Sequence, residues 1–214
     1  MSEKEKIIIT IARQYGSGGA DTGKKLAEDL GISFYDKNIL RMNSDESGIK
    51  ESYFHLADEK AGNRLLYKII NTLTPEKGAP SFGSDLISAD NLFRFQSEVI
   101  RKLAAEESCV IIGRCADVIL KDYHPLNLFI YADMEAKVER CIRRAPEGEH
   151  LTRNEIERMI KQVDKNRAQY RQMYSDTKWG AKESYHLCVN TTERYMKEIV
   201  PGLAAYVRCW FNEE

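Results

Sequence analysis

Residues 6–31 read KIIITIARQYGSGGADTGKKLAEDLG, and this stretch decides the fold. A run of β-branched residues at 7–12 predicts a buried strand, because isoleucine and threonine suit a covered, pleated surface. Small and apolar residues then recur at helical spacing from Ala20 to Leu30, and Gly31 stands where a left-handed residue can end that helix. We therefore expect a strand, a glycine-rich turn and a helix in succession.

The turn between them, Gly16-Ser17-Gly18-Gly19, predicts a phosphate-binding loop. Glycines permit positive φ and close approach, and N–H groups from a turn and a helix start can converge there on an anion. The alternative is a tight connection that binds nothing. Because a strand precedes the turn and a helix follows it, we favour phosphate binding. The candidate phosphate-binding residues are Gly16, Ser17, Gly18, Gly19, Ala20, Asp21 and Lys24.

Lys24 needs a separate argument, because the loop can be read in two registers. A G-x-x-x-x-G-K pattern from Gly18 to Lys24 would make Lys24 the phosphate lysine, with Lys25 where a hydroxyl usually holds Mg²⁺. A helix starting at Lys24 would be roughly 10 Å long, too short to recross a strand of roughly 17–20 Å. We therefore place Gly19 at the lysine position, which leaves Lys24 as a surface residue or a more distant phosphate contact.

The rest of the chain alternates strands and helices. After a short second strand ending at Tyr35, apolar runs predict buried parallel strands at 109–112, 126–131 and 185–189. Start and stop signals predict helices from Asp133 to Pro146, from Thr152 to about Tyr174, and from about Thr192 to Trp210 with a kink or break at Pro201. This order predicts one α/β domain: a parallel sheet of about five strands with helices on both faces and ligands beyond the carboxyl ends of the strands.

The composition excludes several classes of protein. Lys and Arg total 32 against 33 Asp and Glu, and a formal net charge of −1 argues against a dedicated nucleic-acid or membrane-surface binder. Five scattered cysteines without a C-x-x-C pair suit reduced thiols in a cytosol, and four scattered histidines show no zinc-ligand spacing. The apolar run from Ile7 to Ile11 is too short for a signal peptide, so we expect a cytoplasmic protein without a structural metal site.

Three arginines are the main candidates for contacts to phosphate groups. Arg13 ends the first strand, where it either lies over phosphates or forms a salt bridge at the strand end. Arg114 directly follows the strand at 109–112, where its planar guanidinium can grip a monophosphate through two hydrogen bonds. Arg167 falls on the apolar stripe of the long helix and needs an anion. That anion is a phosphate, or Asp164 in a purely structural pair, unless the side chain snorkels to solvent.

Further charged residues extend the candidate set. Arg171 and the cluster Arg140, Arg143 and Arg144 can line the same mouth, although three arginines on one helix also fit a solvated face. Asp36, at the end of the second strand, can hold an acceptor ribose or base, or it can cap the following helix. Residues 147–150 suit the hinge of a lid that excludes water during transfer.

Several blocks of sequence follow one another in the order of a known family: Ile8 to Gly19, Gly23 to Ala27, Phe34 to Lys37, Val110 to Asp117, Asp164 to Arg167, Tyr170, Trp179-Gly180 and Tyr185 to Thr191. They resemble the cytidylate kinase-like family of P-loop nucleoside monophosphate kinases. The resemblance implies a P-loop NTPase fold with a core at 6–42 and 106–214, a monophosphate-binding insertion at about 43–105 and a lid at about 146–155. It also implies ATP with Mg²⁺ as donor and CMP or dCMP as nucleotide acceptor.

We accordingly assign two groups of side chains. Those expected to stabilise the transferred phosphate are Arg13, Arg167, Arg171 and Arg144. Those expected to contact the acceptor are Asp36, Arg114, Asp117 and Asp164.

The chain also departs from the family pattern. Gly19 replaces the loop lysine, as this branch of the family tends to show, Ala20 and Asp21 replace hydroxyls that would face Mg²⁺, and Ile112 replaces a carboxylate before Gly-Arg. Arginines would then have to supply the missing charge. Two alternatives stay open: a nucleotide-binding regulatory protein that has lost catalysis, and a P-loop kinase that acts on another small molecule.

Overall fold

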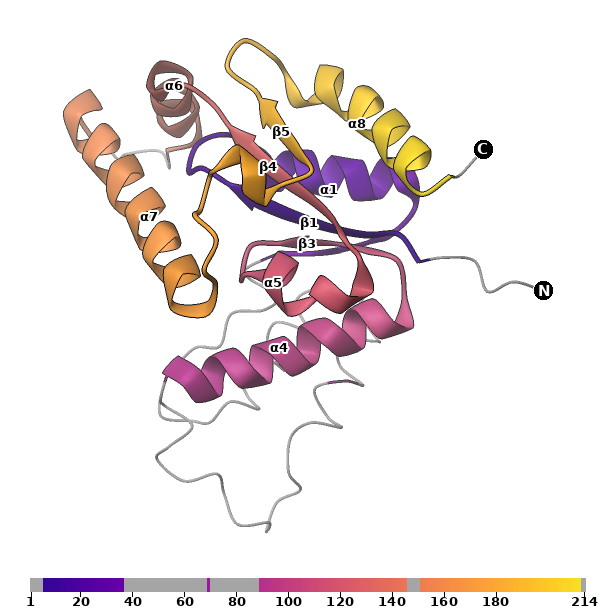
Figure 1. Cartoon of the computed structure of the whole chain (residues 1–214). Helices are drawn as coiled ribbons and strands as arrows, with labels where there is room; N and C mark the ends of the chain where they lie inside the picture. Colours follow the sequence, from indigo (N-terminus) through magenta and orange to yellow (C-terminus); the bar gives the residue numbers. More distant parts are fainter. Residues whose placement is uncertain (1–5, 37–68, 70–88, 146–150, 213–214) are drawn as a thin grey trace.

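A computed structural model of the chain describes residues 6–36, 69, 89–145 and 151–212. Within them, five strands form one parallel sheet in the order β2-β3-β1-β4-β5 (Figure 1). The strands are β1 (Ile8–Arg13), β2 (Ser33–Tyr35), β3 (Cys109–Ile112), β4 (Leu126–Tyr131) and β5 (Leu187–Asn190). The expected α/β fold with about five parallel strands is confirmed.

β1 lies at the centre of the sheet, where Ile9 pairs with Val110 of β3 and with Leu126 of β4. All three side chains are fully buried. A parallel sheet is covered on both faces, so its central strands carry continuous apolar runs instead of alternating ones. This is why short apolar runs were enough to locate β1, β3 and β4.

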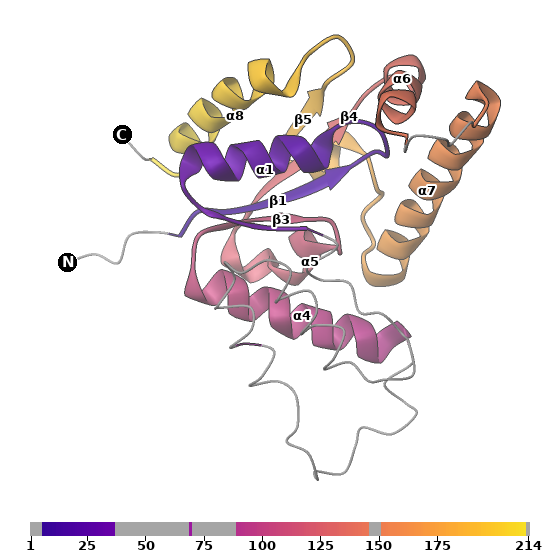
Figure 2. The same ribbon diagram turned by 180° about the vertical axis from the view of Figure 1, so that it is seen from behind.

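Helices cover both faces of the sheet (Figure 1, Figure 2). α1 and α8 lie side by side on one face, and Leu26 of α1 and Val207 of α8 belong to one buried cluster with Ile9. α4 and α5 lie on the other face, where Leu103 packs with Ile111 of β3. The helix bounds are α1 (Gly19–Leu30), α4 (Ala89–Glu106), α5 (Ala116–Ile119), η2 (Lys121–Tyr123), α6 (Met134–Arg144), α7 (Arg153–Tyr174), η3 (Lys182–Ser184) and α8 (Met196–Trp210).

α6 and α7 stand beyond the carboxyl ends of the strands (Figure 1). The predicted caps are confirmed: Asp133 Oδ1 accepts from Ala136 N at 2.8 Å, and Thr152 forms a capping box with Glu155. The two helices pack through Val138 of α6 and Ile156 of α7, which are both buried. α6 and α7 therefore border the edge of the sheet at which β1 and β3 end.

The expected start of the last helix at Thr192 is wrong, because α8 begins at Met196. Asn190 Oδ1 accepts from Thr192 N at 3.0 Å and from Thr192 Oγ1 at 2.6 Å, a local turn that competes with helix formation. Pro201 does not divide the helix, since it lies in its second turn and α8 continues to Trp210. β5 also begins at Leu187, two residues later than expected.

Much of the expected insertion and lid lies outside the described residues. For the insertion these are 43–68 and 70–88, and for the lid they are 146–150. The division of the chain into core, insertion and lid therefore stays a prediction. Among the described helices, none is long and apolar enough to cross a membrane.

Candidate functional site

The loop between β1 and α1 presents main-chain N–H groups at the carboxyl edge of the sheet. Gly16 and Gly18 adopt left-handed φ values of 76° and 78°, which residues with a side chain rarely reach. In the described part of the chain, no acceptor is within hydrogen-bond distance of the N–H groups of Gly16, Gly18, Gly19, Ala20 and Asp21. We call these five donors the cradle. Together with the positive end of the α1 dipole, they suit an anion.

The carbonyl groups of the same loop are held by Arg140 of α6. Its buried guanidinium donates to Gly16 O and Ser17 O, at 3.4 Å each, and to the hydroxyl and carbonyl oxygens of Thr191. The Thr191 hydroxyl also donates to Ser17 O at 2.8 Å. Burial lowers the pKa of Arg140, and the neighbouring arginines of α6 lower it further. Arg140 therefore helps to hold the conformation of the loop by binding its carbonyl groups.

No lysine fits at the usual lysine position of this loop. A Cβ atom added at Gly19 would lie 2.6 Å from Arg13 Cβ and 3.2 Å from Ile130 Cβ. The first distance is shorter than real Cβ contacts, so glycine is required there by packing. The stem of Arg13 occupies the space that a lysine side chain would need.

The Arg13 side chain continues toward Gly113, into a cavity of about 320 Å³ beyond the ends of β1 and β3. Arg114 and Arg167 also line this space, which we call the arginine cavity. Burial is the largest cause that lowers the pKa of Arg13 to about 9, followed by the positive charges of Arg167 and Arg114. Like charges gathered in a half-buried space favour the entry of an anion.

Carboxylates only partly offset this charge. Asp36 and Asp164 act on the pKa of Arg13 in the opposite direction, but among the described residues Arg13 forms no ion pair. Asp36 is half-buried at the end of β2, and the helix that it was expected to cap lies outside the described residues.

Arg114 enters the cavity from a strained backbone. Gly113, Arg114 and Cys115 follow β3 with φ values of 74°, 57° and 53°, all left-handed. This conformation costs roughly 1–2 kcal/mol for each residue with a side chain, and such strain concentrates at functional sites. The Tyr170 hydroxyl is hydrogen-bonded to Arg114, and burial raises the pKa of Tyr170 to about 12. The strained turn places the Arg114 guanidinium beside Arg13.

Arg167 and Asp164 of α7 contact the main chain that leads into the loop. Arg167 donates to Arg13 O at 2.9 Å, and Asp164 Oδ1 accepts from Tyr15 N at 2.7 Å. The two side chains lie 3.4 Å apart, so the structural pair considered for Arg167 is present. Arg167 also lines the arginine cavity, whereas Asp164 is not among the lining residues.

Arg171 and Asp117 form a buried ion pair at 2.6 Å. From the sequence, we expected Arg171 to contact the transferred phosphate and Asp117 to contact the acceptor. Arg171 also donates to Thr177 through Nε and Nη2. Both residues line the arginine cavity, but the charge of each is compensated by the other. This pair stiffens the wall of the cavity and adds little net charge to it.

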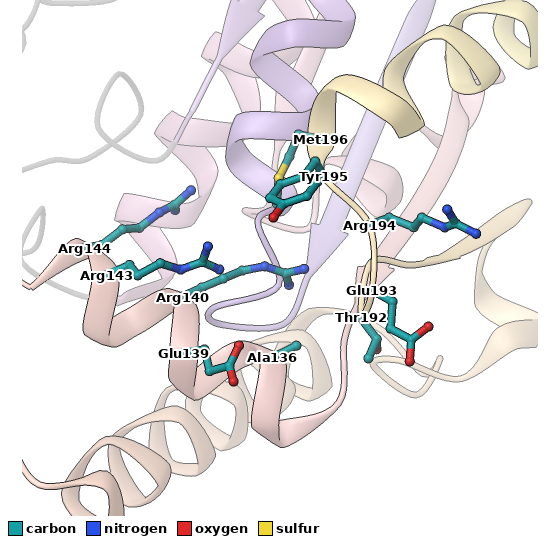
Figure 3. Close-up of a pocket in the computed structure, with 10 residues that line it drawn as sticks. All are labelled: Ala136, Glu139, Arg140, Arg143, Arg144, Thr192, Glu193, Arg194, Tyr195 and Met196. Carbon is teal, nitrogen blue, oxygen red and sulfur yellow. The ribbon is translucent and has the colours of Figure 1, made fainter.

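A second cavity, of about 450 Å³, lies between α6 and the residues that lead into α8. Figure 3 shows Arg140, Arg143 and Arg144 on α6 facing the segment 192–196. We call this space the α6 cavity. Its lining residues are Ala136, Glu139, Arg140, Arg143, Arg144, Thr192, Glu193, Arg194, Tyr195 and Met196.

Asp21 and Lys24 of α1 differ in their relation to this cavity. Asp21 is ion-paired with Arg144, across the mouth of the loop. Lys24 is exposed and lies 4.0 Å from Glu28, so it has the surface position considered from the sequence. Neither residue contacts the arginine cavity.

The loop offers poor ligands for Mg²⁺. Ala20 has no oxygen in its side chain, and the Asp21 carboxylate is engaged by Arg144. In the described part of the chain, no group of three His, Cys, Asp or Glu side chains is placed to hold a metal ion. A magnesium ion at this loop would therefore need most of its ligands from groups other than these side chains.

The sequence interpretation missed Lys137 of α6, which is only 5% exposed. Its ammonium group donates to Gln14 Oε1 at 3.2 Å and lies 3.7 Å from Asp164 Oδ2. A signal was available, because Lys137 stands one helical turn before Cys141 on the expected apolar face. A lysine beside such a face, close to a loop without a lysine of its own, is a candidate for the site.

Comparison with solved structures supports the same fold. An uncharacterized protein from Eubacterium ventriosum ATCC 27560 is 29% identical, with a TM-score of 0.66 over 94% of this chain and 98% of that one. A shikimate kinase from Bacteroides thetaiotaomicron is 14% identical, with a TM-score of 0.52 over 96% of this chain and 98% of that one. At 14% identity the likeness shows the fold alone. No curated protein matches the chain.

The family pattern described as "Cytidylate kinase-like family" matches residues 8–193. The match begins in β1, includes the loop and the helices that border both cavities, and ends just before α8. The chain therefore has the P-loop kinase fold and belongs to the cytidylate kinase-like family.

Proposed function

We propose that the protein is an ATP-dependent kinase that phosphorylates a nucleoside monophosphate, most readily CMP or dCMP. One observation carries the proposal: the cradle and the arginine cavity adjoin each other, and Arg13 joins them. A donor phosphate in the cradle and an acceptor phosphate in the cavity would be neighbours. Phosphoryl transfer depends mainly on such positioning and on nearby positive charge.

The donor would bind by its triphosphate in the cradle and extend into the α6 cavity. Arg143 and Arg144 face that cavity, so their charges suit the outer phosphates. Binding of the donor would compete with Asp21 for Arg144, since these two side chains form an ion pair. Bound Mg²⁺ would neutralise charge on the donor phosphates.

The acceptor monophosphate would be gripped by Arg114, with Arg13 between acceptor and donor. Arg13 has no carboxylate partner in the described residues, so an anion beside it would offset the burial and the neighbouring positive charges that lower its pKa. Arg167 would add charge from the α7 side. Asp36, near Arg13 at the end of β2, would face the sugar or base of the acceptor.

The test is turnover of MgATP with a panel of nucleoside monophosphates, measured as ADP release. We expect selective use of CMP or dCMP. Arg114→Lys should lower kcat/KM for the acceptor about 10- to 100-fold, with KM for ATP changed less than about 3-fold, because lysine lacks the planar two-donor grip. Arg158→Lys, on the exposed side of α7, is the matched control.

Other outcomes would contradict the proposal in distinct ways. Saturable ATP binding without turnover of any acceptor favours the nucleotide-binding regulatory protein. The lack of space for a lysine side chain at Gly19 also fits that alternative. Turnover with a small molecule other than a nucleotide favours a P-loop kinase of different specificity. Turnover of CMP that is indifferent to Arg114→Lys would refute the assigned acceptor site.

A further inference from the structure

Three consecutive residues before the glycines are each held by a different side chain from α6 or α7. Arg167 donates to Arg13 O at 2.9 Å, Lys137 donates to the Gln14 side chain at 3.2 Å, and Asp164 accepts from Tyr15 N at 2.7 Å. The segment 13–15 is therefore fixed at every residue by groups from outside the loop.

The three holding groups also hold one another. Asp164 lies 3.7 Å from the Lys137 ammonium and 3.4 Å from the Arg167 guanidinium. The side chains of Lys137 and Asp164 are 6% and 14% exposed, so solvent screens their interaction only weakly. Burial raises the pKa of Asp164, and Tyr15 N, Arg167 and Lys137 counteract that rise. Asp164 is the shared partner of two cations on two helices.

The two helices border different parts of the site. α6 carries the arginines of the α6 cavity (Figure 3), and α7 carries Arg167 of the arginine cavity. Asp164 itself is absent from the lining of the arginine cavity, although its neighbours Val163 and Asn166 belong to it. Its carboxylate is thus committed to the loop and to Lys137, which places it between the two cavities.

The direction of the Arg13 side chain depends on this network. Among the described residues no carboxylate pairs with Arg13, and the charges of Arg167 and Arg114 oppose its own. No ion pair among the described residues therefore fixes its guanidinium, and the held main chain at 13–15, with the packing of its stem against Gly19, sets the direction of the side chain. Loss of the network would let Arg13 turn away from its neighbours.

We propose that Lys137 and Asp164 are positioning residues that fix the segment 13–15, aim Arg13 between donor and acceptor, and so couple α6 to α7 during transfer. The proposal rests on the proposed function for its catalytic consequence. Its structural part, the clamp on Tyr15 and Gln14, is independent of any turnover.

A double-mutant cycle tests the catalytic part. Lys137→Met and Asp164→Asn should each lower kcat for CMP phosphorylation about 10- to 100-fold, with KM for ATP changed less than about 3-fold. The double variant should be no slower than the slower single variant, since both substitutions disrupt the same interaction network.

Lys137→Arg should recover at least part of kcat because it keeps the charge. The exposed pair Lys161–Glu157 on α7 supplies the control, Lys161→Met with Glu157→Gln, with kcat within about 2-fold of wild type.

Amide hydrogen exchange tests the clamp without turnover. In the nucleotide-free protein, the Tyr15 amide should exchange roughly 5- to 10-fold faster in Asp164→Asn, because a charge-assisted hydrogen bond becomes a neutral one. Amides of β3 should be unchanged. Inactive wild type with the expected exchange would refute the proposed function and keep the clamp. Unchanged Tyr15 exchange, or additive losses of kcat in the double variant, would overturn the clamp.

Discussion

Arg13→Met should raise the free energy of unfolding of the protein without nucleotide. It should also abolish the further rise that an acceptor nucleotide such as CMP produces. Methionine keeps most of the stem that packs against Gly19, and it removes the guanidinium charge that has no carboxylate partner among the described residues. A cation that serves function is then kept in place at a cost to the stability of the fold. Function and stability should then change in opposite directions.

The magnitude follows from the pKa of Arg13, which burial and the neighbouring arginines lower to about 9. At about 1.36 kcal/mol for each pH unit, the protonated guanidinium is less favourable in the folded protein by roughly 3–5 kcal/mol. Because this pKa is lowered, the destabilisation is present in full below about pH 9 and fades as the pH rises further. The Arg13 side chain is only partly buried, so solvent screens part of this cost, and replacing buried charges by apolar groups gains about 1–4 kcal/mol. We expect a gain of about 1–2 kcal/mol at pH 7.

Urea unfolding at pH 7, with and without CMP, measures both effects. At CMP concentrations about 100 times Kd, the wild-type free energy of unfolding should rise by about 2.7 kcal/mol. The rise for Arg13→Met should be below about 0.5 kcal/mol. Arg158→Met, at an exposed position of α7, is the control and should change neither quantity.

Two results would refute this account of Arg13. A loss of more than about 1 kcal/mol in the nucleotide-free variant would mean that the guanidinium stabilises the fold. A full CMP response in the variant would mean that the acceptor binds away from Arg13.

Three further substitutions have defined outcomes. Gly19→Lys, meant to restore a loop lysine, should lower the free energy of unfolding by about 2–4 kcal/mol in urea and should not increase turnover, because its Cβ would lie 2.6 Å from Arg13 Cβ. Arg171→Met should cost about 3–5 kcal/mol, seen as a lower Tm, because it leaves Asp117 buried without its cation; an unchanged Tm would contradict the pairing. Lys24→Ala should leave KM for ATP within about 2-fold, since Lys24 is exposed beside Glu28, and a large rise in KM would restore the rejected register.

Local patterns predicted most of the fold. The apolar runs of β3 and β4, the cap at Asp133 and the capping box at Thr152 each depend on residues within a few positions of one another. The start of α8 was missed because Asn190 binds Thr192, and this local turn competes with the helix.

The candidate site was predictable in its residue types and less so in their partners. Arg13 and Arg114 stand at strand ends, and the parallel sheet brings those ends to one edge. Lys137 was missed because its place one helical turn before Cys141 indicates a position beside the apolar face but not which groups its ammonium contacts. Its partners Gln14 and Asp164 are 123 and 27 residues away along the chain.

The amino-acid sequence alone determined the strand and helix order, the position of the glycine loop and the set of charged residues around it, because these depend on short-range patterns. Only the tertiary structure decided which charges neutralise one another and which stay available. Tyr15 and Asp164 meet across 149 residues, and Arg171 meets Asp117 across 54. Such pairings depend on how whole helices pack, since the direction of a long side chain is set by its neighbours in space.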